Sequence, residues 1–167
     1  MKRAPVFDRT LALWRYEFPC DRLVLSLKYR ARTALAGFFA RSFSAHAMPE
    51  VDLIVPMPLH RKRLAERGFN QALEIARPLA SMLGLPVDPR CANRIRDTPP
   101  QTALPFEARA KNVHGALACD KNLSGRTVAV VDDVMTTGAT LNELARVLKR
   151  AGATRVVNLV VARTMPD

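Results

Sequence analysis

Residues 127–140 read Thr127-Val128-Ala129-Val130-Val131-Asp132-Asp133-Val134-Met135-Thr136-Thr137-Gly138-Ala139-Thr140. The stretch begins with apolar and β-branched residues, a pattern typical of a strand buried on both faces of a parallel sheet. Two carboxylates follow where that strand would end, then small and hydroxylated residues, and then an amphipathic helix expected over 141–151. The pattern predicts a strand, a loop and a helix at the edge of an α/β sheet where ligands bind.

The loop has the composition of a phosphate-binding site. Backbone N–H groups at a helix N-terminus point into such a loop, and the helix dipole adds about half a positive charge there. The hydroxyls of Thr136, Thr137 and Thr140 can add donors, and Gly138 lets a phosphate approach the backbone closely.

The paired carboxylates make the prediction more specific, because Asp132 and Asp133 would repel a bare phosphate. Successive residues at a strand end point to opposite sides, so at most one of them can be buried at low cost. Ribose hydroxyls, with Mg²⁺ nearby, would satisfy both. A ribose 5-phosphate therefore fits the loop, whereas the glycine patterns of P-loops and dinucleotide folds do not occur in it. The alternative is an ordinary strand-to-helix turn with solvated aspartates.

Residues 130–140 resemble the phosphoribosyl pyrophosphate (PRPP) motif of type I phosphoribosyltransferases. Further segments, in the same order along nearly the whole chain, resemble the ComF competence family. They are Leu25-Ser26-Leu27-Lys28-Tyr29, Val55-Pro56-Met57-Pro58-Leu59-His60, Arg67-Gly68-Phe69-Asn70-Gln71-Ala72, residues 94–101 and Arg109-Ala110-Lys111-Asn112-Val113.

The chain has 167 residues and a net charge of +11. A positive charge of this size favours polyanionic partners. Aromatic residues make up only 6%, and basic and aromatic residues do not interleave as they do in a base-stacking surface, so nucleic-acid contact stays open. Cys20, Cys91 and Cys119 are odd in number and widely spaced, which argues against a disulfide framework or a zinc site. No apolar stretch has the length of a membrane span, and we expect a cytoplasmic protein.

Two regions are expected within one globular unit: an N-terminal helical segment over 1–48 and a phosphoribosyltransferase domain over 49–167. Apolar spacing predicts helices over 11–16, 23–29 and 33–47, preceded by an extended arm. In the second helix Lys28 is expected to face outward. In the third, Leu35, Phe38, Phe39 and Phe43 are expected in the core.

A second strand-loop-helix unit is expected before the central motif. Residues 51–55 predict a strand, a basic segment follows, and Asn70 is a good N-cap for a helix that ends at Gly84 and is kinked or split at Pro78. The simpler interpretation is that the basic segment is part of the solvated protein surface and binds no ligand. Because both units would end at one sheet edge, we expect this segment to bind pyrophosphate through Pro58, Leu59, His60, Arg61 and Arg67.

The stretch 94–112 has almost no periodicity, which is typical of a functional loop or of disorder. We expect it to be a mobile flap that closes over an anionic substrate. Strands are also expected over 85–94, at a sheet edge, over 113–118, and over 156–161 in the core. The order of elements predicts a parallel α/β sheet. The flap candidates are Arg94, Arg96, Gln101, Arg109 and Asn112.

The family resemblance implies a type I phosphoribosyltransferase (Rossmann-like) fold and a Mg²⁺-PRPP site. It also implies a role in natural transformation, with single-stranded DNA and proteins of the competence machinery as partners, and phosphoribosyltransferase domains often form homodimers. Family members commonly carry a four-cysteine zinc ribbon before this domain; this sequence begins after it, so zinc is not expected. Asp132 and Asp133 would hold the ribose hydroxyls and Mg²⁺. The 5-phosphate would lie against Val134, Met135, Thr136, Thr137, Gly138, Ala139 and Thr140.

As an enzyme, the protein would displace pyrophosphate from the anomeric carbon, with Asp132, Asp133, Arg61 and Arg63 as catalytic residues. Thr136 stands where 6-oxopurine transferases carry an acid, and a hydroxyl cannot replace that acid near neutral pH, which disfavours such acceptors. Three functions stay open. They are a transferase with an unknown acceptor, a competence factor that binds PRPP or single-stranded DNA without transfer, and a structural domain with a relict site.

Overall fold

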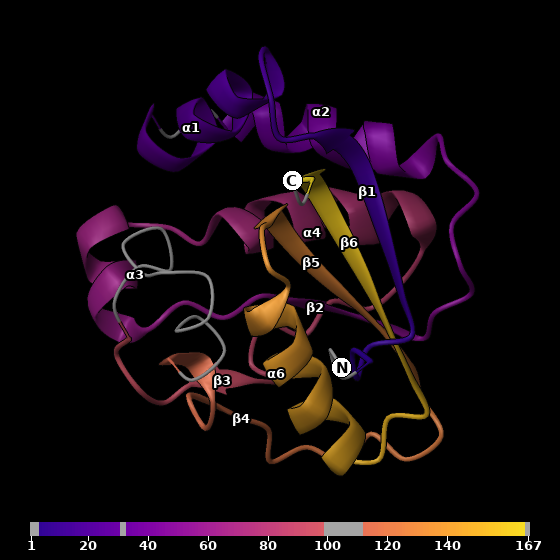
Figure 1. Cartoon of the computed structure of the whole chain (residues 1–167). Coiled ribbons are helices and arrows are strands. Elements are labelled where there is room, and N and C mark those ends of the chain that lie inside the picture. The colour runs from indigo at the N-terminus through magenta and orange to yellow at the C-terminus, as the bar shows by residue number, and fades with distance from the viewer. Residues whose placement is uncertain (1–3, 31–32, 99–111, 166–167) are drawn as a thin grey trace.

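The computed structural model describes residues 4–30, 33–98 and 112–165. Within these residues, four strands form a sheet in the order β1-β6-β5-β2, and each neighbouring pair is parallel (Figure 1). This confirms the predicted parallel α/β fold. The strands are β1 (Arg9–Arg15), β2 (Leu53–Pro56), β5 (Thr127–Met135) and β6 (Arg155–Arg163).

Helices cover both faces of the sheet, which is why its central strands are rich in valine. In β5, Val128 and Val130 pack toward α6, while Ala129 and Val131 pack toward α1, α2 and α4. The end of β5 therefore lies between two helical layers. The helices are α1 (Cys20–Arg30), α2 (Thr33–Ser44), α4 (Gln71–Leu83) and α6 (Ala139–Arg150).

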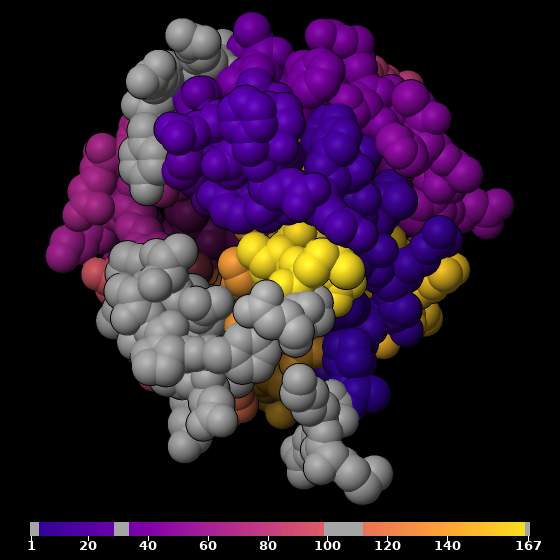
Figure 2. All heavy atoms as spheres, turned by 45° about the horizontal axis from the view of Figure 1, so that its top comes forward, coloured from indigo at the N-terminus to yellow at the C-terminus, as the bar shows by residue number. Residues whose placement is uncertain are grey.

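A smaller substructure lies to one side of the sheet (Figure 1). It consists of the short helix α3 (Arg61–Arg67) and an antiparallel pair, β3 (Asn93–Arg94) with β4 (Leu117–Ala118). We call the β3–β4 pair the hood. Figure 2 looks more directly onto the carboxyl edge of the sheet, where the N-terminal layer lies against the end of β6.

The N-terminal segment differs from its prediction. Residues 11–16 were expected to be helical, but most of them belong to the edge strand β1, which pairs with β6 from Arg9 to Arg15. The side chains of Leu11 and Leu13 pack toward α1 and α2, while Ala12 packs toward α6. This is a two-residue alternation. The segment 11–16 is too short for the spacing of its apolar residues to distinguish a helix from a strand. It forms a strand because it can pair with the edge of β6.

Helix α4 confirms its predicted ends. The Asn70 side chain accepts hydrogen bonds from the N–H groups of Ala72 (2.9 Å) and Leu73 (3.3 Å), and Gly84 ends the helix with φ 65°. Of the kink or split predicted at Pro78, the split is wrong, because one helix runs through this residue. Proline has no backbone N–H, so the helix loses one hydrogen bond at Pro78. Burial of the apolar face of α4 offsets this loss of stability.

Three other local predictions need correction. The strand expected over 113–118 is limited to β4, and the edge strand expected over 85–94 is reduced to β3 and a single bridge between Val87 and Ile54. In α2, Phe39 and Phe43 are fully buried as predicted, but Phe38 is 40% exposed. Its ring instead stacks on Trp14 of β1, with the ring centroids 5.8 Å apart.

Candidate phosphoribosyl site

The loop between β5 and α6 has the shape that its sequence predicts. Gly138 is the N-cap of α6 with φ 76°, a conformation that favours glycine. A Cβ at this position would lie 2.6 Å from the Met135 Cε atom. The Thr137 hydroxyl accepts a hydrogen bond from the Ala139 N–H at 3.2 Å. The loop and the strand end line a small hollow of about 30 Å³ formed by Asp132, Val134, Met135, Thr136, Gly138, Ala139, Thr140 and Leu141.

Asp133 is buried against a lysine from the N-terminal layer. Its Oδ2 atom lies 2.8 Å from Nζ of Lys28 on α1, and the residue is only 4% exposed. Burial acts to lower the pKa of Lys28, but the carboxylate of Asp133 outweighs it, and the lysine pKa is raised overall. The prediction that Lys28 faces outward is therefore wrong. An ammonium group offsets the cost of burying this carboxylate, which the sequence had left without a partner.

Asp132 has a different environment from its neighbour. Its Oδ1 atom accepts the Asp133 N–H at 2.9 Å. Burial raises the pKa of Asp132, and the adjacent Asp133 carboxylate raises it further, since two close negative charges disfavour each other. Asp132 is among the residues that line the hollow of the loop, whereas Asp133 is not. Asp132 is therefore the candidate for contact with a ligand in the loop.

The basic segment after β2 is a helix rather than a loop. Arg61–Arg67 form α3, which starts directly after His60. Arg63 donates a hydrogen bond to the carbonyl of Thr98 at 2.6 Å, whereas Arg67 donates to the side chain of Gln71 on α4, also at 2.6 Å. Arg63 thus lies toward the hood, and Arg67 is turned toward α4.

Arg94 of the hood brings a second cation to the same place. Its guanidinium donates to the hydroxyl of Thr98, so Arg63 and Arg94 converge on one residue. Burial lowers the pKa of Arg94, and the positive charge of Arg63 lowers it further, while Asp132 partly compensates. Two guanidinium groups this close raise the local positive potential, which suits an anion.

The predicted flap is only partly described. Arg96 donates to the backbone carbonyls of Asn112 (3.0 Å) and His114 (2.7 Å), so this residue ties the two ends of the flap together. Gln101 and Arg109 lie outside the described residues. Closure of the flap stays a prediction.

A cavity of about 870 Å³ opens beside the basic helix, between α3, the start of α4 and the hood. This volume lies in the range of small-molecule sites. Its lining combines the cations Arg61, Arg77 and Arg94 with apolar side chains such as Leu64 and Phe69. Of the predicted pyrophosphate residues, Pro58, Leu59, His60 and Arg61 line this cavity.

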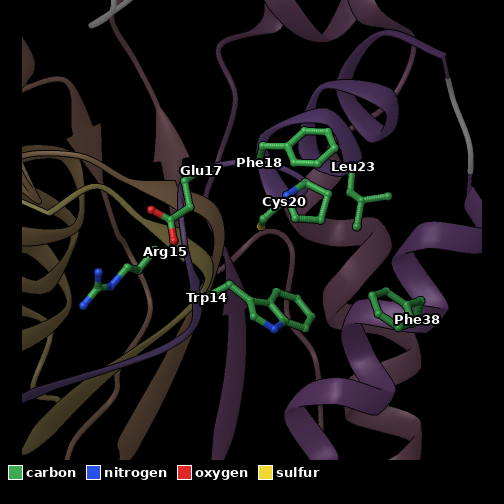
Figure 3. Close-up of a pocket in the computed structure, with 8 residues that line it drawn as sticks. Trp14, Arg15, Glu17, Phe18, Cys20, Leu23 and Phe38 are labelled. Atoms are coloured by element: carbon green, nitrogen blue, oxygen red, sulfur yellow. The ribbon is translucent and has the colours of Figure 1, made fainter.

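A second cavity, of about 370 Å³, lies in the N-terminal layer (Figure 3). Trp14, Phe18, Leu23 and Phe38 give it a mainly apolar lining, and the labelled Arg15 side chain points away from these rings. The two predicted catalytic aspartates are not among its lining residues.

The metal-binding capacity of the site is limited. Among the described residues, no group of three or more His, Cys, Asp or Glu side chains could hold a metal ion. Asp132 and Asp133 therefore fit Mg²⁺ only as one or two of its ligands, and a bound substrate would supply the others, which is how this ion commonly binds in phosphate sites.

Cys91 and Cys119 are neighbours in the fold, and burial together with Cys119 raises the pKa of Cys91 to about 12. Over the described ranges, no helix is long and apolar enough to cross a membrane.

The structure brings Asp132, Asp133, Arg63 and Arg94 toward one edge, and it adds Lys28 and Thr98, which the sequence interpretation missed. The sequence contained an indication that Lys28 is buried. It stands four residues after Val24 and next to Leu27, both fully buried, so it extends the apolar stripe of α1. A lysine on such a stripe indicates a buried anionic partner. For Thr98, the sequence carries no comparable pattern.

Comparisons with known proteins give a family match and several relatives. The Phosphoribosyl transferase domain family matches residues 70–165. "DNA utilization protein YhgH" of Salmonella typhi is 32% identical over 99% of this chain and 76% of its own length. "Competence protein F" of Haemophilus influenzae is 30% identical over 93% of this chain and 73% of its own length. Glutamine PRPP amidotransferase from B. subtilis shares the fold, with a TM-score of 0.50 and 23% identity over 77% of this chain and 26% of that one.

Proposed function

The chain belongs to the phosphoribosyl transferase domain family, among the competence and DNA utilization proteins, and from this premise we propose that it binds Mg²⁺-PRPP and transfers the phosphoribosyl group to an acceptor. The observation that carries the proposal is the juxtaposition at the end of β5. A carboxyl pair and a glycine-capped helix start lie there, and two guanidinium groups converge on Thr98, of which Arg94 interacts electrostatically with Asp132.

Each part of the site has a role in this reaction. The loop Thr136–Thr140 would hold the 5-phosphate through backbone N–H groups and hydroxyls. Asp132 would accept hydrogen bonds from the ribose hydroxyls, while Asp133 is held against Lys28 behind it. Arg63 and Arg94 would bind the pyrophosphate. The ligand is anionic at both ends and hydroxylated in the middle, and the roles proposed here follow that order.

Catalysis would be mainly electrostatic. The bond between the anomeric carbon and the pyrophosphate oxygen breaks, and the acceptor forms the new bond to that carbon. The guanidinium groups stabilise the charge that gathers on the leaving pyrophosphate, and the carboxylates favour the positive charge that develops on the ribose. When bound, Mg²⁺ would supply further neutralisation of the pyrophosphate. A 6-oxopurine acceptor is disfavoured, since Thr136 has no acidic function there.

Calorimetric titration tests the binding step. Mg²⁺-PRPP is titrated into the wild type and into Asp132→Asn, which keeps the shape of the side chain and leaves the Lys28–Asp133 pair intact. We expect saturable binding by the wild type and at least about a tenfold loss in the variant, since a hydrogen bond to a charged group contributes about 1.5–3 kcal/mol. A folded wild type that binds no Mg²⁺-PRPP would overturn the proposal. Release of pyrophosphate with a panel of acceptors then tests transfer.

A second function is favoured by the exposed cations of α3 together with the names of the relatives. Arg61 and Lys62 are exposed on a chain of net charge +11. A competence factor could use this surface to bind single-stranded DNA without transferring anything. Binding to DNA phosphates weakens steeply as salt rises, so the affinity for an oligonucleotide measured at two salt concentrations distinguishes this function. DNA binding that coexists with an inactive PRPP site would favour it over the transferase.

A further inference from the structure

Lys28 lies in the phosphoribosyl site although it belongs to a different layer. It projects from α1 of the N-terminal segment, and its Nζ atom is 2.8 Å from Asp133 Oδ2. The side chains are only 21% and 6% exposed, so little water shields the pair. The charge also acts on Asp132, whose electrostatic effect on Lys28 has the same sign as that of Asp133. One ammonium group therefore pairs with Asp133 and also acts electrostatically on Asp132.

Packing alone does not account for this choice of residue. Taking a lysine and an aspartate out of water costs several kcal/mol for each ion, and apolar residues of similar size often give equal or greater stability. The neighbours of Lys28 on α1, Val24 and Leu27, are apolar and fully buried. A charged residue at the one point of this stripe that meets the paired carboxylates indicates a role in the chemistry of the site.

Without Lys28, the buried Asp133 carboxylate would lose its ion-pair partner and would lie beside a second carboxylate, Asp132, which also interacts with Arg94. Such a pair attracts divalent cations, which prefer oxygen ligands. With Lys28 in place, Asp133 is neutralised and Asp132 remains as the protein's carboxyl ligand on the open side of the loop. A single carboxyl group holds Mg²⁺ weakly, unless phosphate oxygens of a ligand complete its coordination.

Building on the proposed function, we infer that Lys28 is a resident cation of the phosphoribosyl site, which occupies Asp133 so that the protein takes up Mg²⁺ only together with the diphosphate ligand. Lys28 is thus a positioning residue. It holds the carboxylate of Asp133 in place and decides which form of the ligand is accepted, the metal–diphosphate complex rather than the metal followed by the diphosphate.

The test measures metal binding without PRPP. Mn²⁺ serves as a paramagnetic probe, and its binding is followed for the wild type, Lys28→Gln and Lys28→Arg at one pH and ionic strength. Glutamine keeps a hydrogen-bond donor toward Asp133 but removes the charge. We expect Lys28→Gln to bind Mn²⁺ at least about tenfold more tightly than the wild type, because one nearby positive charge is lost. Lys28→Arg should remain close to the wild type.

Two controls separate this role from a structural one. Lys28→Gln/Asp133→Asn should lose the gained affinity, since the second carboxylate is then absent. Lys149→Gln removes the charge of another lysine–aspartate pair, with Nζ 2.9 Å from Asp8 Oδ2, and should leave Mn²⁺ binding unchanged. Lys28→Gln with the Mn²⁺ affinity of the wild type, or a gain that persists without Asp133, would overturn the inference.

If Mn²⁺ binding to Lys28→Gln is difficult to measure directly, the effect of a divalent cation on thermal stability tests the same expectation. MgCl₂ should raise the melting temperature of this variant and not that of the wild type or Lys149→Gln, compared with NaCl at equal ionic strength. An equal response in all three proteins would contradict the inference. The Mn²⁺ comparison needs no PRPP. A wild type that fails to bind PRPP would therefore refute the proposed function, while the role of Lys28 would still be decided separately.

Discussion

Two lysine–aspartate pairs join the N-terminal segment to the core, one at each end of the sheet. Lys28–Asp133 lies at the carboxyl ends of the strands, with side chains 21% and 6% exposed. Lys149–Asp8 lies at the amino ends, with side chains 29% and 35% exposed. The nitrogen–oxygen distances are nearly the same, 2.8 Å and 2.9 Å. What differs is the access of water.

The partners of the two carboxylates explain the difference. Asp8 accepts the Val156 N–H at 2.8 Å as well as the Lys149 ammonium, so it fastens the chain entering β1 to the start of β6. Asp133 sits beside a second carboxylate and the loop that we propose binds a phosphate. One end of the sheet is arranged for stability. The other keeps like charges together, an arrangement that is expected at a functional site.

The largest effect is expected from removing Lys28. Lys28→Met leaves Asp133 buried without a counter-ion, and breaking a buried pair in this way costs about 3–5 kcal/mol. Urea unfolding of the variant and the wild type measures the loss. A loss below about 1 kcal/mol would mean that water reaches Asp133 freely, and the contrast between the two ends would disappear.

A pair of glycines sharpens the comparison. A Cβ at Gly152, with φ 103°, would lie 2.9 Å from the backbone nitrogen of Ser124, whereas at Gly138 the closest atom is the movable end of Met135. Gly152→Ala should therefore cost roughly 2–4 kcal/mol and leave PRPP affinity unchanged. Gly138→Ala should cost roughly 1–2 kcal/mol and reduce PRPP affinity. Urea unfolding and calorimetry together check both; loss of PRPP binding in Gly152→Ala would contradict the assignment of the two ends.

The exposed pair should contribute little through its lysine. Lys149→Met is expected to cost about 1 kcal/mol or less, since solvent and side-chain entropy offset most of the attraction. The measurement is the same urea unfolding, at low and at high salt. A cost that equals that of Lys28→Met would show that burial does not distinguish the two pairs.

The smallest effect is expected on the stability of the protein at low pH, through the carboxylate of Asp8. Burial acts to raise the pKa of Asp8, but the Val156 N–H and the Lys149 ammonium outweigh it, and the pKa lies below its ordinary value of 3.8. A carboxylate with a lowered pKa adds stability that is complete above pH 3.8 and is lost as the pH falls through its folded-state pKa. Lys149→Met should reduce this acid dependence, and Asp8→Asn should abolish its share. Unfolding free energy measured from about pH 5 downward tests both; an unchanged acid profile in Asp8→Asn would count against it.

The sequence alone determined the central unit of the fold. The valine-rich run, the paired aspartates and the loop before α6 lie within fourteen consecutive residues, and Asn70 and Gly84 bound α4 as expected. These features are local. Alternating burial, helix caps and left-handed glycines depend on neighbours a few residues away, so their spacing reports them directly.

Only the tertiary structure decided the pairings between distant parts of the chain. Lys28 meets Asp133 because α1 crosses the carboxyl edge of the sheet, and residues 11–15 become a strand because β6 offers them an edge. Thr98 receives both guanidinium groups because the fold brings Arg63 of α3 and Arg94 of β3 to the same residue. Spacing along the sequence does not specify which side chains a fold brings together. A lysine on an apolar stripe indicates a buried anion, but its identity depends on how the layers pack.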